Sequence, residues 1–355
     1  MHTWKTTTRA LCALALAGSL AACGDFLTGT DLDTDPNRPT NASRDQLFVA
    51  MQAKQQAFHE GHVARVVTMW VQQFAGTDRQ YIPLDQYVVA EGEFNPQFSG
   101  LYTGGGLVDM RRIVATAEAD GDRRYAGIVK VWEAFTIGMA ASLWGDIPYS
   151  EAVGDNPTPK LDPQAEVYAA VQNLLNAAIT DLQSGTGRGP GAADFIYGGD
   201  ATKWIQAANT LKARFHLHMA EREGNTRYTA ALAAAQGGIS APANDFRTFH
   251  TTQAGEENIW FQFQVRERDT YLRGGAFAIN LLQSRNDPRL QQYYAPAAGG
   301  QFVGARPGEA APGASNLSAA RLAPAFRQPL ITYAENQLIM AEANFRLGNS
   351  GPALQ

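Results

Sequence analysis

The stretch ASLWGDIPYSEA, residues 141–152, decides how the rest of the chain is interpreted. Apolar residues before it recur at steps of three and four, which predicts the end of a long helix. Gly145 ends that helix, and Pro148 makes a turn because its ring fixes φ and excludes the preceding residue from the helical region. Trp144 and Tyr149 bracket the turn. Composition therefore predicts a helix C-terminus that is pinned by two buried rings.

Similar periodicities predict a mostly α-helical chain with few short strands. We expect helices over residues 43–74, 107–119, 124–143, 164–182, 201–221, 228–235, 274–283 and 332–347. Residues 246–266 alternate enough to be short strand or extended chain. Glycine and proline are frequent over residues 76–106, 184–199 and 295–316, which we expect to be loops.

Residues 1–22 have the features of a lipoprotein signal peptide. Lys5 and Arg9 precede an apolar run over residues 10–20 that is too short to span a bilayer. The run ends in Leu-Ala-Ala before Cys23, which is the pattern of a lipobox. Cleavage there would leave Cys23 carrying acyl chains, and several such chains hold a protein stably on a membrane. The alternatives are an ordinary signal peptide with an unrelated cysteine, or a buried N-terminal helix.

The cysteine count and the net charge exclude several functions. Cys12 would leave with the signal peptide and Cys23 would carry lipid, so disulfide frameworks, cysteine zinc sites and thiol catalysis are excluded. Loss of the two basic residues of the leader would take the formal charge from −5 to −7. A mildly acidic surface argues against nucleic acid as a partner. Because no second apolar run has the length of a membrane span, we expect the chain to be anchored to a membrane without crossing it.

Three more stretches carry recognisable motifs. Residues 33–40 read DTDPNRPT, residues 194–220 read DFIYGGDATKWIQAANTLKARFHLHMA, and residues 286–290 read NDPRL. Together with LWGDIPYSEA and the lipobox, these stretches closely resemble the signatures of the SusD/RagB family. Residues 98–102 resemble the W-x-x-L-Y stretch of that family, with Phe98 in place of the tryptophan.

The resemblance implies a fold, a location and a partner. Members of this family are surface lipoproteins of the outer membrane that capture nutrients for a SusC-like TonB-dependent transporter. We therefore expect a lipidated tether over residues 23–42 and a SusD-like helical domain over residues 43–355. That domain would have tetratricopeptide-like helix pairs on one side and loop-rich decoration on the other. The expected ligand is a glycan or another oligomeric nutrient.

The last residues predict an incomplete helical repeat. The stretch LIMAEANFRLGNSGPALQ, residues 338–355, resembles one helix, a turn, and the start of a partner helix opened by Pro352. A half-made repeat cannot bury its apolar face. We therefore expect the chain to be a fragment or to be truncated at its C-terminus.

No stretch of the sequence carries a recognisable catalytic or metal-binding pattern. His59 and His62 are three residues apart on a helix, whereas the zinc proteases need a spacing of four with an intervening glutamate. The glycine run at residues 104–106 lacks the preceding strand of a phosphate-binding loop. We expect no enzyme activity, no metal and no cofactor. Two other functions stay open, namely a helical-repeat scaffold lipoprotein that binds no nutrient and a lipid-anchored glycoside hydrolase.

The candidate ligand-binding residues are rings predicted to lie on loops, with polar groups nearby. Capture of a glycan needs rigid rings against the apolar faces of sugars, and amide, guanidinium or carboxylate groups that bond hydroxyls. The rings that meet this description are those of Tyr81, Tyr102, Trp260 and Tyr271, and the guanidinium groups beside them are those of Arg79 and Arg273.

Overall fold

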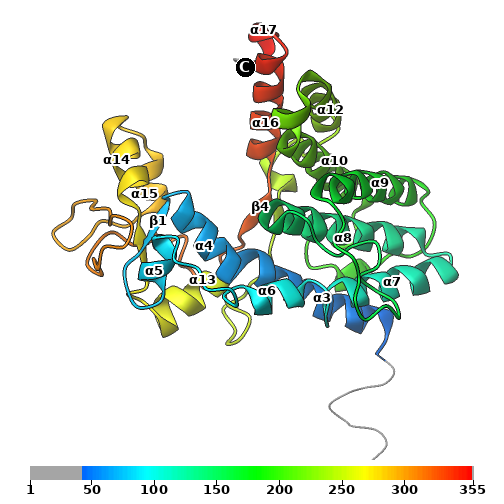
Figure 1. Ribbon diagram of the computed structural model, residues 1–355, viewed down its shortest axis with the longest axis horizontal. Helices are drawn as coiled ribbons and strands as arrows, with labels where there is room; N and C mark the ends of the chain where they lie inside the picture. Colours follow the sequence, from blue (N-terminus) through cyan, green and yellow to red (C-terminus); the bar gives the residue numbers. More distant parts are fainter. Residues whose placement is uncertain (1–41, 354–355) are drawn as a thin grey trace, which may run out of the picture. The chain divides into compact units, whose positions relative to one another are not determined.

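The computed structural model describes residues 42–353, so the predicted signal peptide, Cys23 and almost all of the tether lie outside the described residues. The chain divides into Met1–Ser43 and Arg44–Gln355, and the second unit contains the helices and strands of the described part. Its longer helices are α3 (Arg44–Glu60), α4 (His62–Trp70), α7 (Leu107–Ala119), α8 (Arg123–Trp144), α9 (Gln164–Gln183), α10 (Ala201–His218), α12 (Asn225–Ala235), α14 (Ala276–Ser284) and α16 (Tyr333–Arg346) (Figure 1). Shorter helical segments are α5 (Tyr81–Asp85), α6 (Asn95–Gly100), α11 (Ala220–Glu223), α13 (Ile259–Phe261), α15 (Arg289–Tyr293) and α17 (Ser350–Ala353). The predicted mostly helical fold is confirmed.

Two short antiparallel ribbons join parts of the chain that are far apart in sequence. Strand β1 (Phe74–Gly76) pairs with β3 (Leu272–Gly274), with Phe74 opposite Gly274. Strand β2 (Phe246–Arg247) pairs with β4 (Pro329–Ile331), and its register is irregular. The first ribbon supports the cleft described below, and the second connects the helical stack to the segment that leads into α16.

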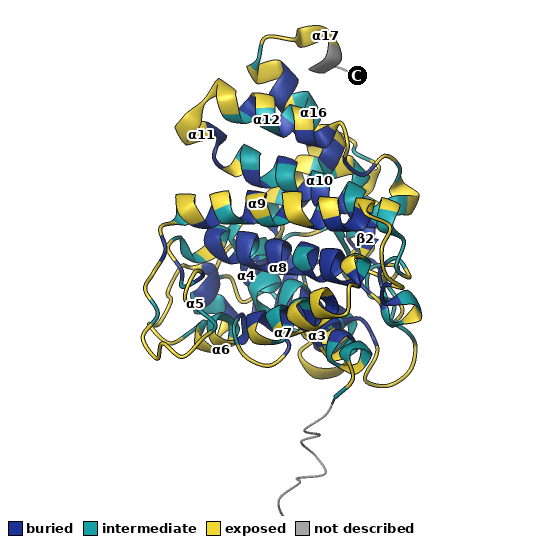
Figure 2. Cartoon of the chain, turned by 90° about the vertical axis from the view of Figure 1, so that its right-hand side faces the viewer, coloured by how far each residue is buried: buried dark blue, intermediate teal, exposed yellow. Residues whose placement is uncertain are grey.

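Helix α8 is the central element of a first hydrophobic cluster, which also contains Phe48, Leu175 and Trp204 from neighbouring helices. Figure 2 shows it buried along most of its length, with α7 on one side and α9 on the other. Trp132 is fully buried and meets the ring of Phe246 edge-on, with centroids 4.9 Å apart. Among the described helices, α8 alone is long and apolar enough to cross a membrane, but 78% of its apolar window is buried inside the protein. Core packing therefore accounts for its hydropathy.

The helices on this side pack in the order in which they occur in the chain. Helix α8 contacts α9, α9 contacts α10, α10 contacts α12, and α12 contacts α16 (Figure 2). Small residues permit the close approach. A Cβ at Gly127 of α8 would lie 3.0 Å from the carbonyl oxygen of Ala178 in α9, and a Cβ at Gly138 would lie 2.2 Å from the ring of Phe215 in α10. This stack confirms the predicted helix pairs.

The turn after α8 forms where the sequence predicts it. Gly145 has a φ of +76°, a conformation that favours glycine. Tyr149 is buried and its hydroxyl donates to Glu133 Oε1 at 3.0 Å. The carboxylate of Asp162 accepts hydrogen bonds from the backbone N–H groups of Tyr149 (3.0 Å) and Ser150 (2.6 Å). The turn is thus closed by one buried ring and one carboxylate.

The second ring of this turn differs from the prediction. Trp144 is half-buried, and it packs edge-on against Phe98 with ring centroids 5.6 Å apart. The indole is therefore only partly covered by α6, which carries Phe98.

Three predicted elements are also corrected. The helix predicted over residues 43–74 is interrupted at Gly61, where a Cβ would lie 2.3 Å from the carbonyl oxygen of Ala57. The segment predicted as an open loop contains α5 and α6. Residues 246–266 are mostly not extended, because Asn258 Oδ1 caps α13 by accepting the N–H of Trp260, and π-helical turns continue to Glu267.

Candidate functional site

A cleft of about 470 Å³ lies beside β1, α14 and α15. Phe277 and Leu281 of α14 line it and are exposed, Phe277 by 58%. Phe74 and Tyr294 are buried and form the apolar wall of the cleft. The ring of Tyr294 is held in place because its hydroxyl donates to the carbonyl oxygen of Gln73 at 2.7 Å. The volume falls in the range that holds a small ligand.

The NDPRL motif holds Arg289 at this cleft. Asn286 has a φ of +48°, which allows the sharp turn between α14 and α15. The carboxylate of Asp287 then accepts from the backbone N–H of Arg289 and from its Nε, both at 2.9 Å. The hydrogen bonds and charge of Arg289 lower the pKa of Asp287 to about 2. The motif therefore fixes a guanidinium group at the rim.

A second guanidinium group is fixed on a ring. The Arg321 side chain lies over the ring of Tyr293, 4.8 Å from its centroid, and both residues line the cleft. The segment that carries Arg321 is tied to α15, because Ser318 donates its N–H to the carbonyl oxygen of Tyr293 (2.9 Å) and its hydroxyl to that of Gln292 (2.7 Å). Rings and donors that are ordered before binding lose little conformational entropy when a ligand arrives.

A smaller hollow of about 170 Å³ adjoins the cleft and shares Phe74 and Arg321 with it. Glu60, at the end of α3, lines this hollow and is buried. Its Oε2 lies 2.8 Å from His250 Nε2, and its Oε1 has no hydrogen-bond partner among residues 42–353. His59 lines the same hollow, and burial, with the charge of Arg214, lowers its pKa to about 3. His59 is therefore neutral at physiological pH.

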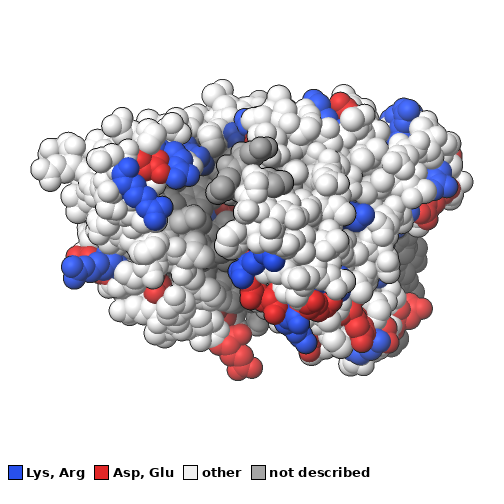
Figure 3. Space-filling view, turned by 90° about the horizontal axis from the view of Figure 1, so that it is seen from above, with Lys and Arg blue, Asp and Glu red and all other residues white. Residues whose placement is uncertain are grey.

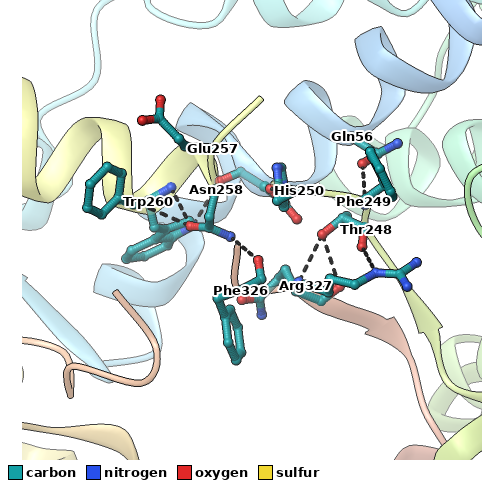
Figure 4. A network of polar contacts seen from close by, with 12 residues as sticks. Gln56, Thr248, Phe249, His250, Glu257, Asn258, Trp260, Phe326 and Arg327 are labelled. Carbon is teal, nitrogen blue, oxygen red and sulfur yellow. Dashed lines mark hydrogen bonds and ion pairs between the residues drawn. The ribbon is translucent and has the colours of Figure 1, made fainter. Parts of the chain in front are cut away.

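A network of hydrogen bonds holds Trp260 at the base of this hollow (Figure 4). Its Nε1 donates to the carbonyl oxygen of Glu60 at 2.9 Å, and its backbone N–H donates to Asn258 Oδ1 at 2.9 Å. Asn258 Nδ2 in turn donates to the carbonyl oxygen of Phe326 at 3.0 Å. These hydrogen bonds join three segments that are distant in the sequence, namely the end of α3, residues 258–260 and Phe326, beneath the smaller hollow.

Another ring-lined hollow, of about 490 Å³, lies beside the turn that follows α8. The rings of Phe94, Phe98 and Trp144 line it, together with the carboxylates of Glu91 and Asp146. The half-buried face of Trp144 is therefore the wall of a surface depression. This hollow has stacking surfaces and hydrogen-bond acceptors, whereas the cleft has stacking surfaces and fixed donors.

The six ligand-binding residues predicted from the sequence do not form one site. Arg79 is exposed and lies outside the cleft and both hollows. Tyr81 is only 1% exposed, and its hydroxyl accepts from Arg65 Nε at 2.9 Å. Tyr102 is half-buried and packs edge-on against Phe98, with centroids 5.5 Å apart. Tyr81 was expected on an open loop, and that expectation is corrected because α5 begins at this residue. Its ring belongs to a second hydrophobic cluster, which also contains Phe74, Trp260 and Phe263.

The other three predicted residues lie around the same cluster. Trp260 is buried and lines the smaller hollow, as described above. Tyr271 is half-buried and meets Tyr81 edge-on, with centroids 5.9 Å apart. Arg273 is buried in β3, where its guanidinium donates to the backbone carbonyl oxygens of Pro312 (2.6 Å) and Asp269. Its position corrects the expectation of an exposed guanidinium, and ligand contact by any of the six stays a prediction.

Sequence reasoning did not select the residues that line the cleft. Phe277 lies in a stretch with helical periodicity, where an apolar residue is normally assigned to the core. Tyr293 and Arg321 come together only through tertiary structure. The NDPRL motif was the signal in the sequence that pointed to this cleft, since the carboxylate of Asp287 can hold the guanidinium group of Arg289 two residues later.

The face that carries α14 and α16 is poor in charge. Seen from above, the surface is hollowed between the part with α14 and the part with α16, and most atoms on this face belong to uncharged residues (Figure 3). The cleft beside α14 adds the guanidinium groups of Arg289 and Arg321, so it suits a ligand rich in hydrogen-bond acceptors.

Comparisons with known proteins agree with the helical fold. A family model described as starch-binding and associating with the outer membrane matches residues 36–349. A SusD/RagB family protein from Bacteroides thetaiotaomicron has a similar fold, with a TM-score of 0.78, 22% identity, and coverage of 88% of this chain and 70% of that one. A chitin-binding SusD homolog from Flavobacterium johnsoniae has a TM-score of 0.73 and 17% identity, over 86% of this chain and 67% of that one. No curated protein sequence matches this chain.

Proposed function

This chain belongs to the SusD-like family of starch-binding proteins that associate with the outer membrane, and we propose that it captures a glycan in the cleft beside α14 and α15. The observation that carries this proposal is the combination of an exposed ring, Phe277, with two guanidinium groups that are already fixed, those of Arg289 and Arg321. A ring offers a stacking surface to the C–H face of a sugar, and guanidinium groups donate to its hydroxyls. Binding and release of this kind need no catalytic group.

We further propose that the protein is a lipoprotein, anchored through Cys23 at the cell surface, and that it delivers the glycan to a SusC-like TonB-dependent transporter. The sequence of the leader and the family membership support this. Substitution Cys23→Ala should release the protein from membranes and abolish labelling by an alkyne fatty acid. Wild-type protein that stays unlabelled would contradict the anchor, and an affinity-tagged lipoprotein that never co-purifies with such a transporter would contradict the partnership.

The glycan proposal is tested by removing the exposed ring. Phe277→Ala should weaken binding of starch or chitin oligosaccharides, identified first on a glycan array. A lost sugar–ring stack of roughly 0.5–1.5 kcal/mol corresponds to about a two- to tenfold weaker affinity by calorimetry. The melting temperature should barely change, because most of this ring is already in water.

The matched control is Phe345→Ala. Phe345 is 70% exposed on α16, and it lies outside the cleft. The Phe345→Ala variant should bind glycan like the wild type. If Phe277→Ala also binds like the wild type while Trp144→Ala does not, the glycan occupies the hollow beside the turn after α8 instead of the cleft.

A further inference from the structure

A hollow of about 440 Å³ near the start of α10 gathers positive charge that the glycan proposal does not use. Its charged lining residues are Lys203, Arg247, Arg327 and Asp245. Among the residues that line the hollow, three cations outnumber one carboxylate, although the formal net charge of the chain is −5. The carboxylates of Asp194 and Asp200 lie outside this lining, where Asp194 accepts from the indole of Trp204 and the N–H of Gly199, and Asp200 caps α10. Cations gathered in a concave place attract anions, because the protein walls focus their field.

Asp245 does not neutralise the hollow. Its Oδ2 accepts from Arg247 at 2.9 Å, and its Oδ1 accepts from the backbone N–H of Tyr333 at 2.8 Å. Both oxygens are thus engaged, one by a single guanidinium group and one by the main chain. The charge of Asp245 is matched by Arg247 alone.

Arg327 carries a charge without a carboxylate partner in the described part of the chain. Its guanidinium donates only to backbone carbonyl oxygens, those of Thr248 (2.7 Å), Phe195 (3.1 Å) and Arg247 (3.4 Å). In Figure 4 this group lies on the side of the network away from Trp260. Arg247 is a direct neighbour, since the Arg327 guanidinium donates to its carbonyl oxygen. Burial, and then the positive charge of Arg247, lower the pKa of Arg327.

Lys203 is the third cation and is the lysine of the YGGDATKW stretch. The other polar groups of that stretch have structural roles, since Trp204 Nε1 donates to Asp194 at 2.7 Å and Asp200 caps α10. Within residues 42–353, the Lys203 ammonium makes no hydrogen bond or ion pair, and only its backbone N–H is used, by Asp200. Its charge is therefore available to a ligand.

We propose that this hollow binds an oxyanion, a carboxylate or sulfate group carried by a sugar. Lys203 supplies an ammonium group that makes no hydrogen bond or ion pair within residues 42–353, and the guanidinium groups of Arg247 and Arg327 supply positive charge that is already in place. An acidic substituent on a glycan would gain charge-assisted hydrogen bonds here that a neutral sugar cannot form. The site is separate from the cleft, and the proposal does not depend on neutral glycans binding there.

The test measures binding of sodium glucuronate, inorganic sulfate and glucose by calorimetry at constant ionic strength. Glucuronate should bind and glucose at the same concentration should not. Lys203→Gln should weaken glucuronate binding by roughly 10- to 100-fold, the effect of losing one hydrogen bond from a charged group. The melting temperature of this variant should stay close to that of the wild type, because the Lys203 ammonium makes no hydrogen bond or ion pair with residues 42–353 that the substitution would remove.

The control variant is Lys54→Gln, which removes an exposed lysine of α3 outside the hollow and should leave glucuronate binding unchanged. Equal binding by the wild type and Lys203→Gln would overturn the proposal. So would binding of inorganic sulfate without binding of any sulfated or carboxylated sugar. Phe277 lines the cleft and Lys203 lines the other hollow, so the two proposals can fail independently. Phe277→Ala tests binding of neutral glycan, and Lys203→Gln tests binding of glucuronate.

Discussion

The pH dependence of stability should report on His59, a half-buried residue whose Nε2 is inaccessible to solvent. Its ring lies flat against that of Phe135, with centroids 3.9 Å apart, and its Nε2 has no hydrogen-bond partner in the described structure. Burial, and then the charge of Arg214, lower its pKa from 6.5 to about 3. The unfolded chain therefore takes up a proton near pH 6.5, whereas the folded protein takes it up only near pH 3.

The sign and size of the effect follow from this difference. A folded-state pKa below the unfolded value contributes stability that is fully present above pH 6.5 and is lost as the pH falls toward 3. Between pH 7.5 and pH 4.5, His59 should reduce the free energy of unfolding by about 2–3 kcal/mol. His62 and His216, whose pKa values are each lowered to about 4, act in the same direction, so the wild-type loss should be larger.

The measurement compares variants across pH. His59→Gln should be less stable than the wild type at pH 7.5, yet it should lose about 2–3 kcal/mol less than the wild type on acidification to pH 4.5 in urea unfolding followed by tryptophan fluorescence. Phe58→Leu is the matched control, because it changes the packing against His59 without removing a titratable group. It should shift the stability equally at both pH values. Identical pH dependence in His59→Gln and the wild type would refute the reasoning and would mean that water reaches the ring.

Two further predictions concern α8. Trp144→Ala should lower stability by about 1–3 kcal/mol in urea unfolding, less than the cost for a fully buried ring, because the residue is only half-buried. A cost of about 5 kcal/mol would contradict the half-buried position. Gly138→Val should cost about 2–4 kcal/mol, since its side chain would run into the ring of Phe215. The control is Gly154→Val, where a Cβ would meet nothing within 4 Å, and this variant should melt within a few degrees of the wild type. If Gly138→Val and Gly154→Val melt at the same temperature, α8 and α10 are further apart than described.

The sequence predicts much of this fold because its helices are amphipathic and their ends are marked. Helix α7 occupies the predicted residues, and α8, α9 and α16 begin and end within one residue of prediction. Gly145 and Pro148 mark the end of α8 because both act through local backbone geometry. Such signals need no knowledge of tertiary contacts.

The predictions that fail depend on contacts between distant segments. The hydrophobic pattern does not predict the break at Gly61 between α3 and α4, since the apolar periodicity continues across it. The helical turns after Asn258 occupy a stretch whose alternation also fits a strand, and packing under the smaller hollow selects between them. The cleft could not be assembled from the sequence for the same reason. Tyr293 and Arg321 are brought together by tertiary contacts such as those of Ser318, which have no local signature.

The pairing of Phe74 in β1 with Gly274 in β3 also affects the order in which parts of the protein fold. The helical stack from α7 to α12 is formed by successive helices, so it can assemble while the chain is still being synthesised. The cleft needs β1 together with α14, α15 and Arg321, so its two sides are separated by a very long loop. Closing that loop costs chain entropy before any of its contacts form. We therefore expect the surface that we propose for the glycan to form after the stack from α7 to α12, as α16 does, since both need residues beyond Gly274.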